Sequence, residues 1–266
     1  MHITTVDKDD VMTLPRSLII VGESAQAEIL ESHISTAAHF YFSNALTDIL
    51  VNQNANLKYY KAQSEGPKAY HIGTTRVLQG QGSQFESFSF SIGAKLTRNN
   101  LNIFLNGEGS SAVLNGLYAV SDSQHVDNHT SVDHRPPRCV SNQLYKGILD
   151  GSATAAFNGK IFVRRIAQQT NSYQLNKNLL LGKGCQVNTK PQLEIFADDV
   201  RCTHGATIGQ LNEEELFYLE SRAIPKNLAV KMLARGFVDD ILSKLTNVEI
   251  HKRFENLLTK TFSILR

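Results

Sequence analysis

Cys202 and His204 lie two residues apart in the stretch DDVRCTHGATIGQLNEEELF, residues 198–217. Thiolate and imidazole groups are both good ligands for transition metals such as zinc and iron. On a β-strand, the two side chains would share one face about 7 Å apart along the chain. They could then approach one ion or cluster together, although chelation of a single zinc ion by both would be strained. The spacing alone favours the alternative, a small buried cysteine beside a hydrogen-bonded histidine.

The number of cysteines limits what this pair can do alone. The chain has three, Cys139, Cys185 and Cys202, and no C-x-x-C pair. An odd count in a chain of this length argues against a disulfide framework. A structural zinc site usually takes four ligands, and an iron–sulfur cluster takes four thiolates, with histidine as an occasional substitute. Any cluster would therefore need histidine or carboxylate ligands, or a second chain.

A second group of potential ligands lies in QHVDNHTSVDH, residues 124–134. On a helix, His125 and His129 would lie one turn apart and could share a metal ion. On a strand they would be about 13 Å apart, too far for one ion with bonds near 2 Å. The Pro136-Pro137 pair that follows favours strand and loop. We therefore expect these side chains, including His134, to form a row of hydrogen bonds along a strand.

Motifs of common enzyme classes are missing from the sequence. GEGSS, residues 107–111, lacks the Lys-Ser/Thr ending of a phosphate-binding loop, and no helix is expected after it. The chain contains neither a G-x-S-x-G elbow nor an H-E-x-x-H zinc motif. No nucleophile and base lie close together in the sequence, although a fold could assemble such a pair from distant residues.

The composition indicates a protein without a nucleic-acid or membrane partner. The 266 residues carry a formal net charge of +2. No window holds the ~18 unbroken apolar residues of a membrane helix. The N-terminal stretch MHITTVDKDDVMTLPRS lacks the apolar core of a secretory signal and the composition of a transit peptide. We therefore expect a cytoplasmic location.

The elements that must position these residues are short strands over residues 15–200. Apolar runs alternate there with turns rich in glycine and asparagine. In ESFSFSIG, Phe88 and Phe90 share a parity with serines between them, as in a half-buried strand. Residues 52–211 contain no long capped helix. Residues 24–50 could hold a short helix in AQAEILESHI, although a strand fits that stretch equally well.

Many short strands with little helix leave three architectures, a sandwich, a barrel or a parallel β-helix. Asn-Gly pairs at 106–107, 115–116 and 158–159 are typical of tight hairpins and keep the sandwich open. The recurring order of apolar run, glycine and polar stretch is more typical of stacked coils. No strict repeat period is visible.

The pattern changes to helices at residue 211. Asn212 can cap a first helix, with Glu215 at the capping-box position, and Pro225 can open a second. A third helix is expected from about Asn247. Apolar residues of the second helix recur at three- and four-residue spacing: Val230, Leu233, Phe237, Ile241 and Leu245. We expect a flexible segment at 1–14, a β core at 15–211 and a C-terminal helical subdomain at 212–266.

Two long stretches resemble one known family. Residues 115–163, NGLYAVSDSQHVDNHTSVDHRPPRCVSNQLYKGILDGSATAAFNGKIFV, resemble the core of the SufB/SufD family of iron–sulfur cluster assembly proteins. Residues 188–225, NTKPQLEIFADDVRCTHGATIGQLNEEELFYLESRAIP, resemble the C-terminal signature of its SufD branch. The resemblance covers roughly residues 15–245. It implies an all-β core, a right-handed parallel β-helix, followed by C-terminal α-helices.

Two departures separate the chain from the SufB branch. SufB members carry Gln-Cys-Asp before the apolar run Leu179-Leu180-Leu181, where this chain has Leu175-Asn176-Lys177. They also read Glu-His-Glu-Ala-Thr where this chain has Thr203-His204-Gly205-Ala206-Thr207. The chain thus resembles the branch without the main cluster cysteine. SufD members usually have a helical N-terminal region, and the β pattern near Pro15 implies that it is missing or very short here.

The resemblance implies a non-catalytic scaffold subunit of a SUF-type iron–sulfur cluster assembly complex. It implies pairing with a SufB-like subunit through the β-helix and docking of the SufC ATPase on the C-terminal helices, where ATPase activity resides. The residues expected to face the ATPase lie on these helices: Phe217, Leu233, Phe237 and Ile241. Whether the isolated chain forms a homodimer stays open.

The resemblance also implies functions for the opening pair. His204 matches a histidine facing a cluster or iron site at the subunit interface, and Cys202 matches its neighbouring cysteine. The iron–sulfur cluster would be transient, with none tightly bound by the isolated chain. Cys185 matches no functional position and is expected to pack. The alternatives are a β-helix polysaccharide lyase or esterase, which the missing secretion signal argues against, and a SufD-like interaction protein without a part in cluster formation.

Overall fold

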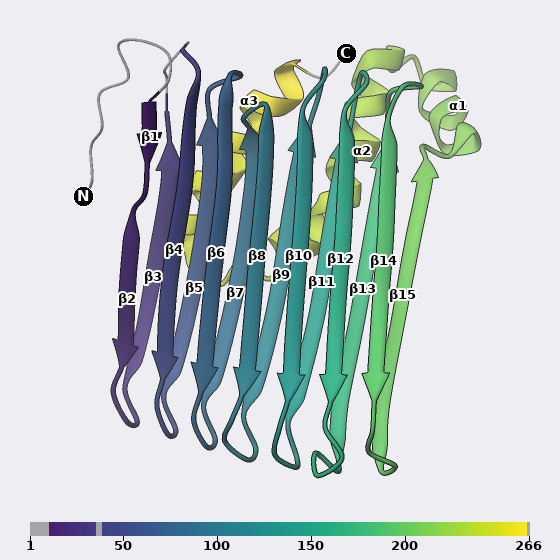
Figure 1. Cartoon of the computed structure of the whole chain (residues 1–266). Helices are drawn as coiled ribbons and strands as arrows, with labels where there is room; N and C mark the ends of the chain where they lie inside the picture. The colour runs from purple at the N-terminus through teal and green to yellow at the C-terminus, as the bar shows by residue number, and fades with distance from the viewer. Residues whose placement is uncertain (1–10, 36–38, 265–266) are drawn as a thin grey trace.

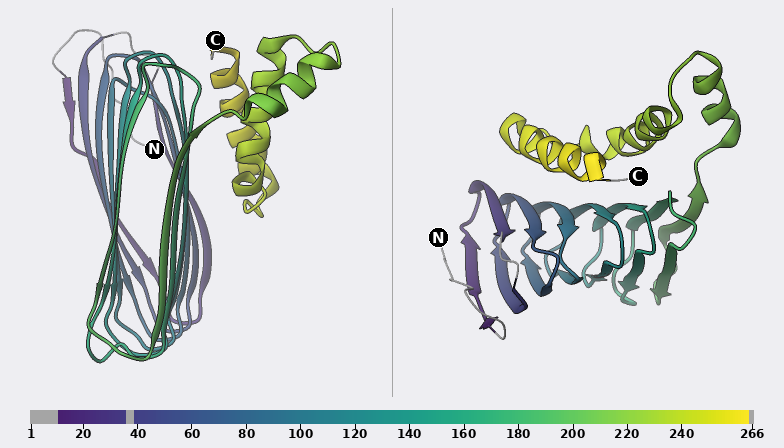
Figure 2. Two further views of the ribbon diagram at one scale, coloured as in Figure 1. Left: turned by 90° about the vertical axis from the view of Figure 1, so that its right-hand side faces the viewer. Right: turned by 90° about the horizontal axis from the view of Figure 1, so that it is seen from above.

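The chain folds into two facing parallel sheets with a helical layer against one of them (Figures 1 and 2). This computed structural model describes residues 11–35 and 39–264. The first sheet has the strand order β1-β4-β6-β8-β10-β12-β14, with β2 also paired to β4. The second has the order β15-β13-β11-β9-β7-β5-β3. From β2 onward, successive strands therefore alternate between the sheets, and each two-strand coil stacks on the previous one.

From β3 onward the strands are similar in length, at 9 to 11 residues, whereas β1 and β2 are shorter. Those of the first sheet are β1 (Val11–Thr13), β2 (Arg16–Val21), β4 (Tyr41–Val51), β6 (Ala69–Gln79), β8 (Leu96–Leu105), β10 (His125–His134), β12 (Thr154–Val163) and β14 (Gln186–Ile195). Those of the second are β3 (Gln26–Ile34), β5 (Asn56–Glu65), β7 (Gln84–Gly93), β9 (Ser111–Val120), β11 (Val140–Leu149), β13 (Thr170–Leu180) and β15 (Val200–Gln210). Of the two alternatives for residues 24–50, helix or strand, the structure shows strand, since β3 contains most of AQAEILESHI.

Every strand pairing in the described ranges is parallel. The predicted parallel β-helix is therefore confirmed, and the hairpin sandwich is excluded. Two of the three Asn-Gly pairs lie inside strands β9 and β12 rather than in turns. Their glycines give room to neighbouring side chains. A Cβ on Gly116 would lie 2.2 Å from the Tyr145 ring, and one on Gly159 would lie 1.9 Å from Nε2 of Gln174.

The β structure begins earlier than the sequence predicts. Residues 1–10 of the predicted flexible segment 1–14 lie outside the described residues. Val11–Thr13 forms β1, which pairs in parallel with the start of β4. Val11 and Thr13 are β-branched residues, the type that is enriched in strands.

The three helices are α1 (Glu213–Ser221), α2 (Lys226–Leu242) and α3 (Val248–Ile264). The predicted cap is confirmed, because the Asn212 side chain accepts from Glu214 N at 2.8 Å. The third helix begins after Asn247 as expected, and the Asn247 side chain accepts from Glu249 N at 3.1 Å. Helices α2 and α3 lie along the outer face of the second sheet (Figure 2). Buried residues of the helices and of β7 form one apolar cluster there. None of the described helices is long and apolar enough to cross a membrane.

The interior of the N-terminal coils holds an ionised carboxylate. Glu31 of β3 accepts hydrogen bonds from Tyr59 at 2.5 Å and from Thr47 at 2.9 Å, and His33 Nε2 lies 2.6 Å from its carboxylate. Burial alone would raise the pKa of Glu31, but the hydrogen bonds from His33 and Tyr59 and the charge of Lys61 outweigh it. Together they lower the pKa to about 2.

This lowered pKa predicts acid sensitivity with a defined sign. A depressed folded-state pKa contributes stability above the unfolded value of 4.5, and that stability is lost as the pH falls towards 2. The contribution of Glu31 should be roughly 2–3 kcal/mol at neutral pH. Glu31→Gln should therefore destabilise the protein near pH 7, and its difference from the wild type should shrink as the pH falls. Urea denaturation across this range measures the free energy of unfolding of both.

A matched variant isolates the buried carboxylate. Glu23→Gln changes an exposed carboxylate in the turn before β3 and should alter stability by less than about 0.5 kcal/mol. An offset between Glu31→Gln and the wild type that stays constant with pH would contradict the prediction.

Candidate ligand site at the open end of the solenoid

Strand β15 brings Cys202 and His204 to the end of the solenoid. It is the terminal strand of the second sheet, and β14 is the terminal strand of the first. Figure 1 shows β15 as the last strand before α1. Parallel pairing with β13 sets Cys202 beside Ser172 and His204 beside Gln174. Since residues two apart on a strand share a face, both predicted ligands lie on the same side of the sheet.

The two side chains differ in exposure. Cys202 is half-buried and packs against a small apolar cluster in the last coils, formed by Ile161, Val163, Ala167 and Ala197. Burial raises the pKa of the Cys202 thiol, against a smaller opposite effect of the Ser172 backbone N–H. His204 is exposed. The cysteine therefore has part of the buried character expected of a packing residue, whereas the imidazole is open to another molecule.

Two hydrogen-bonded rows of buried polar side chains extend from this pair across the neighbouring strands. Behind Cys202, the Ser172 and Ser141 hydroxyls are 2.6 Å apart, and Ser141 Oγ is 2.9 Å from Nε2 of His134. Burial lowers the pKa of His134 to about 4. The interior of these coils is thus polar where it meets the candidate site.

The second row begins at Gln174, the register partner of His204. Gln174 Nε2 donates to Gln143 Oε1 at 3.0 Å, and Gln143 Nε2 donates to Thr130 Oγ1 at 2.6 Å. Both glutamines are at most 2% exposed. Sequence reasoning missed these residues, because they become neighbours of the candidate ligands only through the register between strands.

The histidine-rich stretch forms β10, and its side chains divide between the two faces. His125 and His129 share the outer face, where His125 Nδ1 lies 2.7 Å from Thr154 Oγ1 and His129 Nε2 lies 2.9 Å from Asp127. His134 is fully buried against Ser141. The predicted hydrogen bonding along a strand is confirmed, but it runs on both faces rather than on one.

The described residues contain no group of three or more His, Cys, Asp and Glu side chains that could hold a metal ion. Cys139 and Cys185 are buried and belong to the main apolar core, as the sequence predicts for Cys185. Cys202 and His204 therefore offer two ligand groups on one exposed strand. The remaining ligands of any cluster would have to come from another molecule.

The residues predicted to face a partner on the helices fall into different environments. Phe217 of α1 is 70% exposed, and Leu233 lines an open pocket between α1 and α2. Phe237 is partly buried under Lys146, whose Nζ lies 4.6 Å from the ring centroid. Ile241 is fully buried in the cluster beneath α2. It therefore serves packing and does not present its side chain to another protein in this structure.

The exposed apolar surface of α1 and α2 extends beyond the predicted residues. Tyr218, Leu228 and Met232 are 54%, 49% and 46% exposed. Exposed apolar residues at helical spacing next to an open pocket are typical of a protein-binding surface. The amphipathic pattern of α2 could not assign these residues, since it marks an apolar face without saying what covers it.

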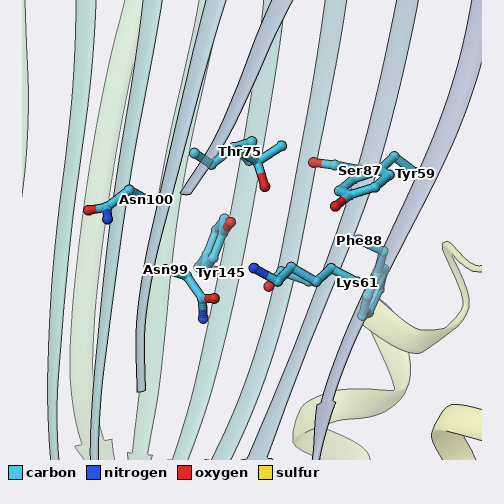
Figure 3. A pocket seen from close by; sticks show the side chains of 10 residues that line it. Tyr59, Lys61, Thr75, Ser87, Phe88, Asn99, Asn100 and Tyr145 are labelled. Atoms are coloured by element: carbon cyan, nitrogen blue, oxygen red, sulfur yellow. The ribbon is translucent and has the colours of Figure 1, made fainter. Parts of the chain in front are cut away.

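A pocket inside the solenoid is too small for a substrate. Its lining includes Tyr59, Lys61, Asn99 and Tyr145 from strands of both sheets, as Figure 3 shows. The cavity volume is about 20 Å³, which is room for about one water molecule. A polysaccharide-acting enzyme would need a groove that accepts sugar rings, and this interior cavity does not supply one.

The parallel solenoid and the helical layer against its second sheet define the class of protein, a parallel β-helix with C-terminal helices. Residues 3–237 match the family model described as "SUF system FeS cluster assembly, SufBD core domain". The chain belongs to this family.

Curated relatives agree with this membership. The chain is 36% identical over 247 residues to the iron–sulfur cluster assembly protein SufD of Escherichia coli, with 92% of this chain and 58% of that protein covered. It is 34% identical over 267 residues to an iron–sulfur cluster assembly SufBD family protein of Synechocystis, covering 97% and 59%. The chloroplastic protein ABCI7 of Arabidopsis thaliana is 36% identical, covering 91% and 51%. The chain thus spans about half to three fifths of these relatives.

Proposed function

We propose that this protein is a SufD-type scaffold subunit of a SUF-type iron–sulfur cluster assembly complex. The observation that carries the proposal is the exposed His204 beside the half-buried Cys202 on the terminal strand of the solenoid. An unpaired strand edge can take up a strand of another chain. A SufB-like subunit that pairs there would bring its own thiolate and carboxylate groups to these two.

The cluster is cargo in this proposal and not a resident cofactor. His204 serves as the principal ligand, because neutral imidazole binds iron well. Cys202 is secondary, since its thiol is half-buried and must lose a proton before it binds metal. The chain itself is non-catalytic, and ATP hydrolysis belongs to a partner subunit.

We propose that a SufC-type ATPase docks on the helical subdomain. Phe217, Tyr218, Leu228 and Met232 offer exposed apolar side chains there, and the open pocket between α1 and α2 is flanked by Glu214 and other polar residues. A mixed apolar and acidic surface of this kind fits a protein partner. We place the assembly in the cytoplasm, as the sequence predicts.

The test is co-expression of this chain with SufB- and SufC-type partners, followed by anaerobic purification of the complex. His204→Ala should leave the complex intact and reduce its iron and its cluster absorbance by at least about tenfold, since a ligand group is lost. Iron analysis and absorbance spectra measure both.

Thr203→Ala is the matched control, because Thr203 is exposed on the opposite face of the same strand. It should keep the wild-type cluster content. Equal cluster content in His204→Ala and the wild type would rule out the proposed function of His204. The interaction-only alternative would then be favoured, provided that the three subunits still purify together.

A further inference from the structure

The glutamine beside His204 has one hydrogen-bonding group left over. Gln174 is fully buried, and its register partner on β15 is His204. Its Nε2 donates to Gln143, but its Oε1 has no hydrogen-bond partner among the described residues. A buried acceptor without a donor is unfavourable, since burial removes it from water. A donor in reach of this oxygen would therefore be stabilising.

The direction of the hydrogen bonds fixes which atom of Gln174 is free. Gln143 uses Nε2 to donate to Thr130, which leaves its Oε1 to accept from Nε2 of Gln174. Along this row, each side chain donates a hydrogen bond to the neighbour that lies farther from the open end of the solenoid. A donor that continues this order would lie on β15, the next strand of the sheet.

The amide of Gln174 is also held in place from the opposite sheet. Gly159 of β12 lies against it so closely that a Cβ there would be 1.9 Å from Nε2. Adjacent strands are about 4.8 Å apart, so side chains in register on one face can reach each other. Since Cys202 packs into the interior, His204 faces the same side as Gln174.

We infer that Gln174 is a positioning residue for His204: a rotation of the His204 side chain brings its ring N–H to Oε1 of Gln174, which has no donor among the described residues. A bond to one ring nitrogen fixes the tautomer and leaves the other nitrogen free to bind metal. The use of that free nitrogen as a metal ligand rests on the proposed function. The inferred hydrogen bond joins two residues of one chain, so it can be tested without the partner subunits.

The test is nitrogen-15 NMR of the imidazole groups in the isolated, histidine-labelled chain, above the ordinary histidine pKa of about 6.5. The signals of His204 are assigned by their loss in His204→Ala. Gln174→Met should change the tautomer ratio of His204 by about two- to tenfold, the range expected for one net hydrogen bond. Gln174→Glu, which keeps an acceptor oxygen, should preserve the wild-type ratio.

Gln79→Met is the control for a structural effect. Gln79 is also fully buried and hydrogen-bonded, but it lies on β6, far from β15 in the strand order. The Gln79→Met variant should lower the melting temperature about as much as Gln174→Met does. It should leave the tautomer ratio of His204 unchanged. An identical ratio in the wild type and Gln174→Met would overturn the inference. Cluster loss in His204→Ala complexes reports on the proposed function separately.

Discussion

Gly107→Ala should destabilise the protein by at least about 3 kcal/mol, the upper range for overpacking. Gly107 lies in the turn after β8, and a Cβ there would be 1.9 Å from the backbone N of Gln81 and 2.1 Å from the backbone C of Gly80. Both atoms belong to the turn of the preceding coil. A backbone neighbour cannot rotate away as a side chain can, so the stacked turns would have to separate. Urea denaturation measures the loss.

Gly22→Ala is the matched control, since Gly22 follows β2 as Gly107 follows β8. A Cβ on Gly22 would meet nothing within 4 Å. This variant should be neutral or more stable by up to about 1 kcal/mol, because alanine restricts the unfolded chain. Equal stability of the two variants would contradict the stacking argument.

Phe254→Ala should cost about 3–5 kcal/mol and loosen the helical layer. Phe254 of α3 is fully buried, and its ring centroid lies 4.9 Å from that of Phe90 and 5.6 Å from that of Phe88 on β7. Truncation removes the ring that packs on Phe88 and Phe90 and leaves a cavity between α3 and the sheet. Denaturation measures the loss of stability, and limited proteolysis should show faster cleavage near α3.

The control on the same helix is Val248→Ala. Val248 is 75% exposed at the start of α3, so its truncation should change stability by less than about 0.5 kcal/mol. A loss for Phe254→Ala no larger than this value would show that the helical layer does not depend on this contact.

The period-2 pattern of β7 predicted a strand, but it did not indicate which face packs against the helices and which faces the solenoid interior. Phe88 and Phe90 point outward under the helices, whereas Ser87 and Ser91 are buried in the solenoid. Alternation predicts two faces, and here both faces are covered. The residue pattern favoured stacked coils but left a sandwich and a barrel open, because pairing between coils joins residues far apart in sequence. The family resemblance decided between them.

Local features of the protein follow from the order of its residues alone. Asn212 and Asn247 cap helices because their side chains reach backbone N–H groups two or three residues away. Cys202 and His204 share a face because strand side chains alternate. These features depend on neighbours along the chain, so the order of residues is sufficient to predict them.

The surroundings of those residues depend on packing between segments that are distant along the chain. The same apolar stripe of α2 contains Leu233 beside an open pocket and Ile241 buried on the sheet, because packing on a distant strand selects the covered positions. The end position of β15 leaves His204 exposed, and the register with β13 places Gln174 beside it. Register is set by the stacking of whole coils, and no short stretch of sequence contains that information.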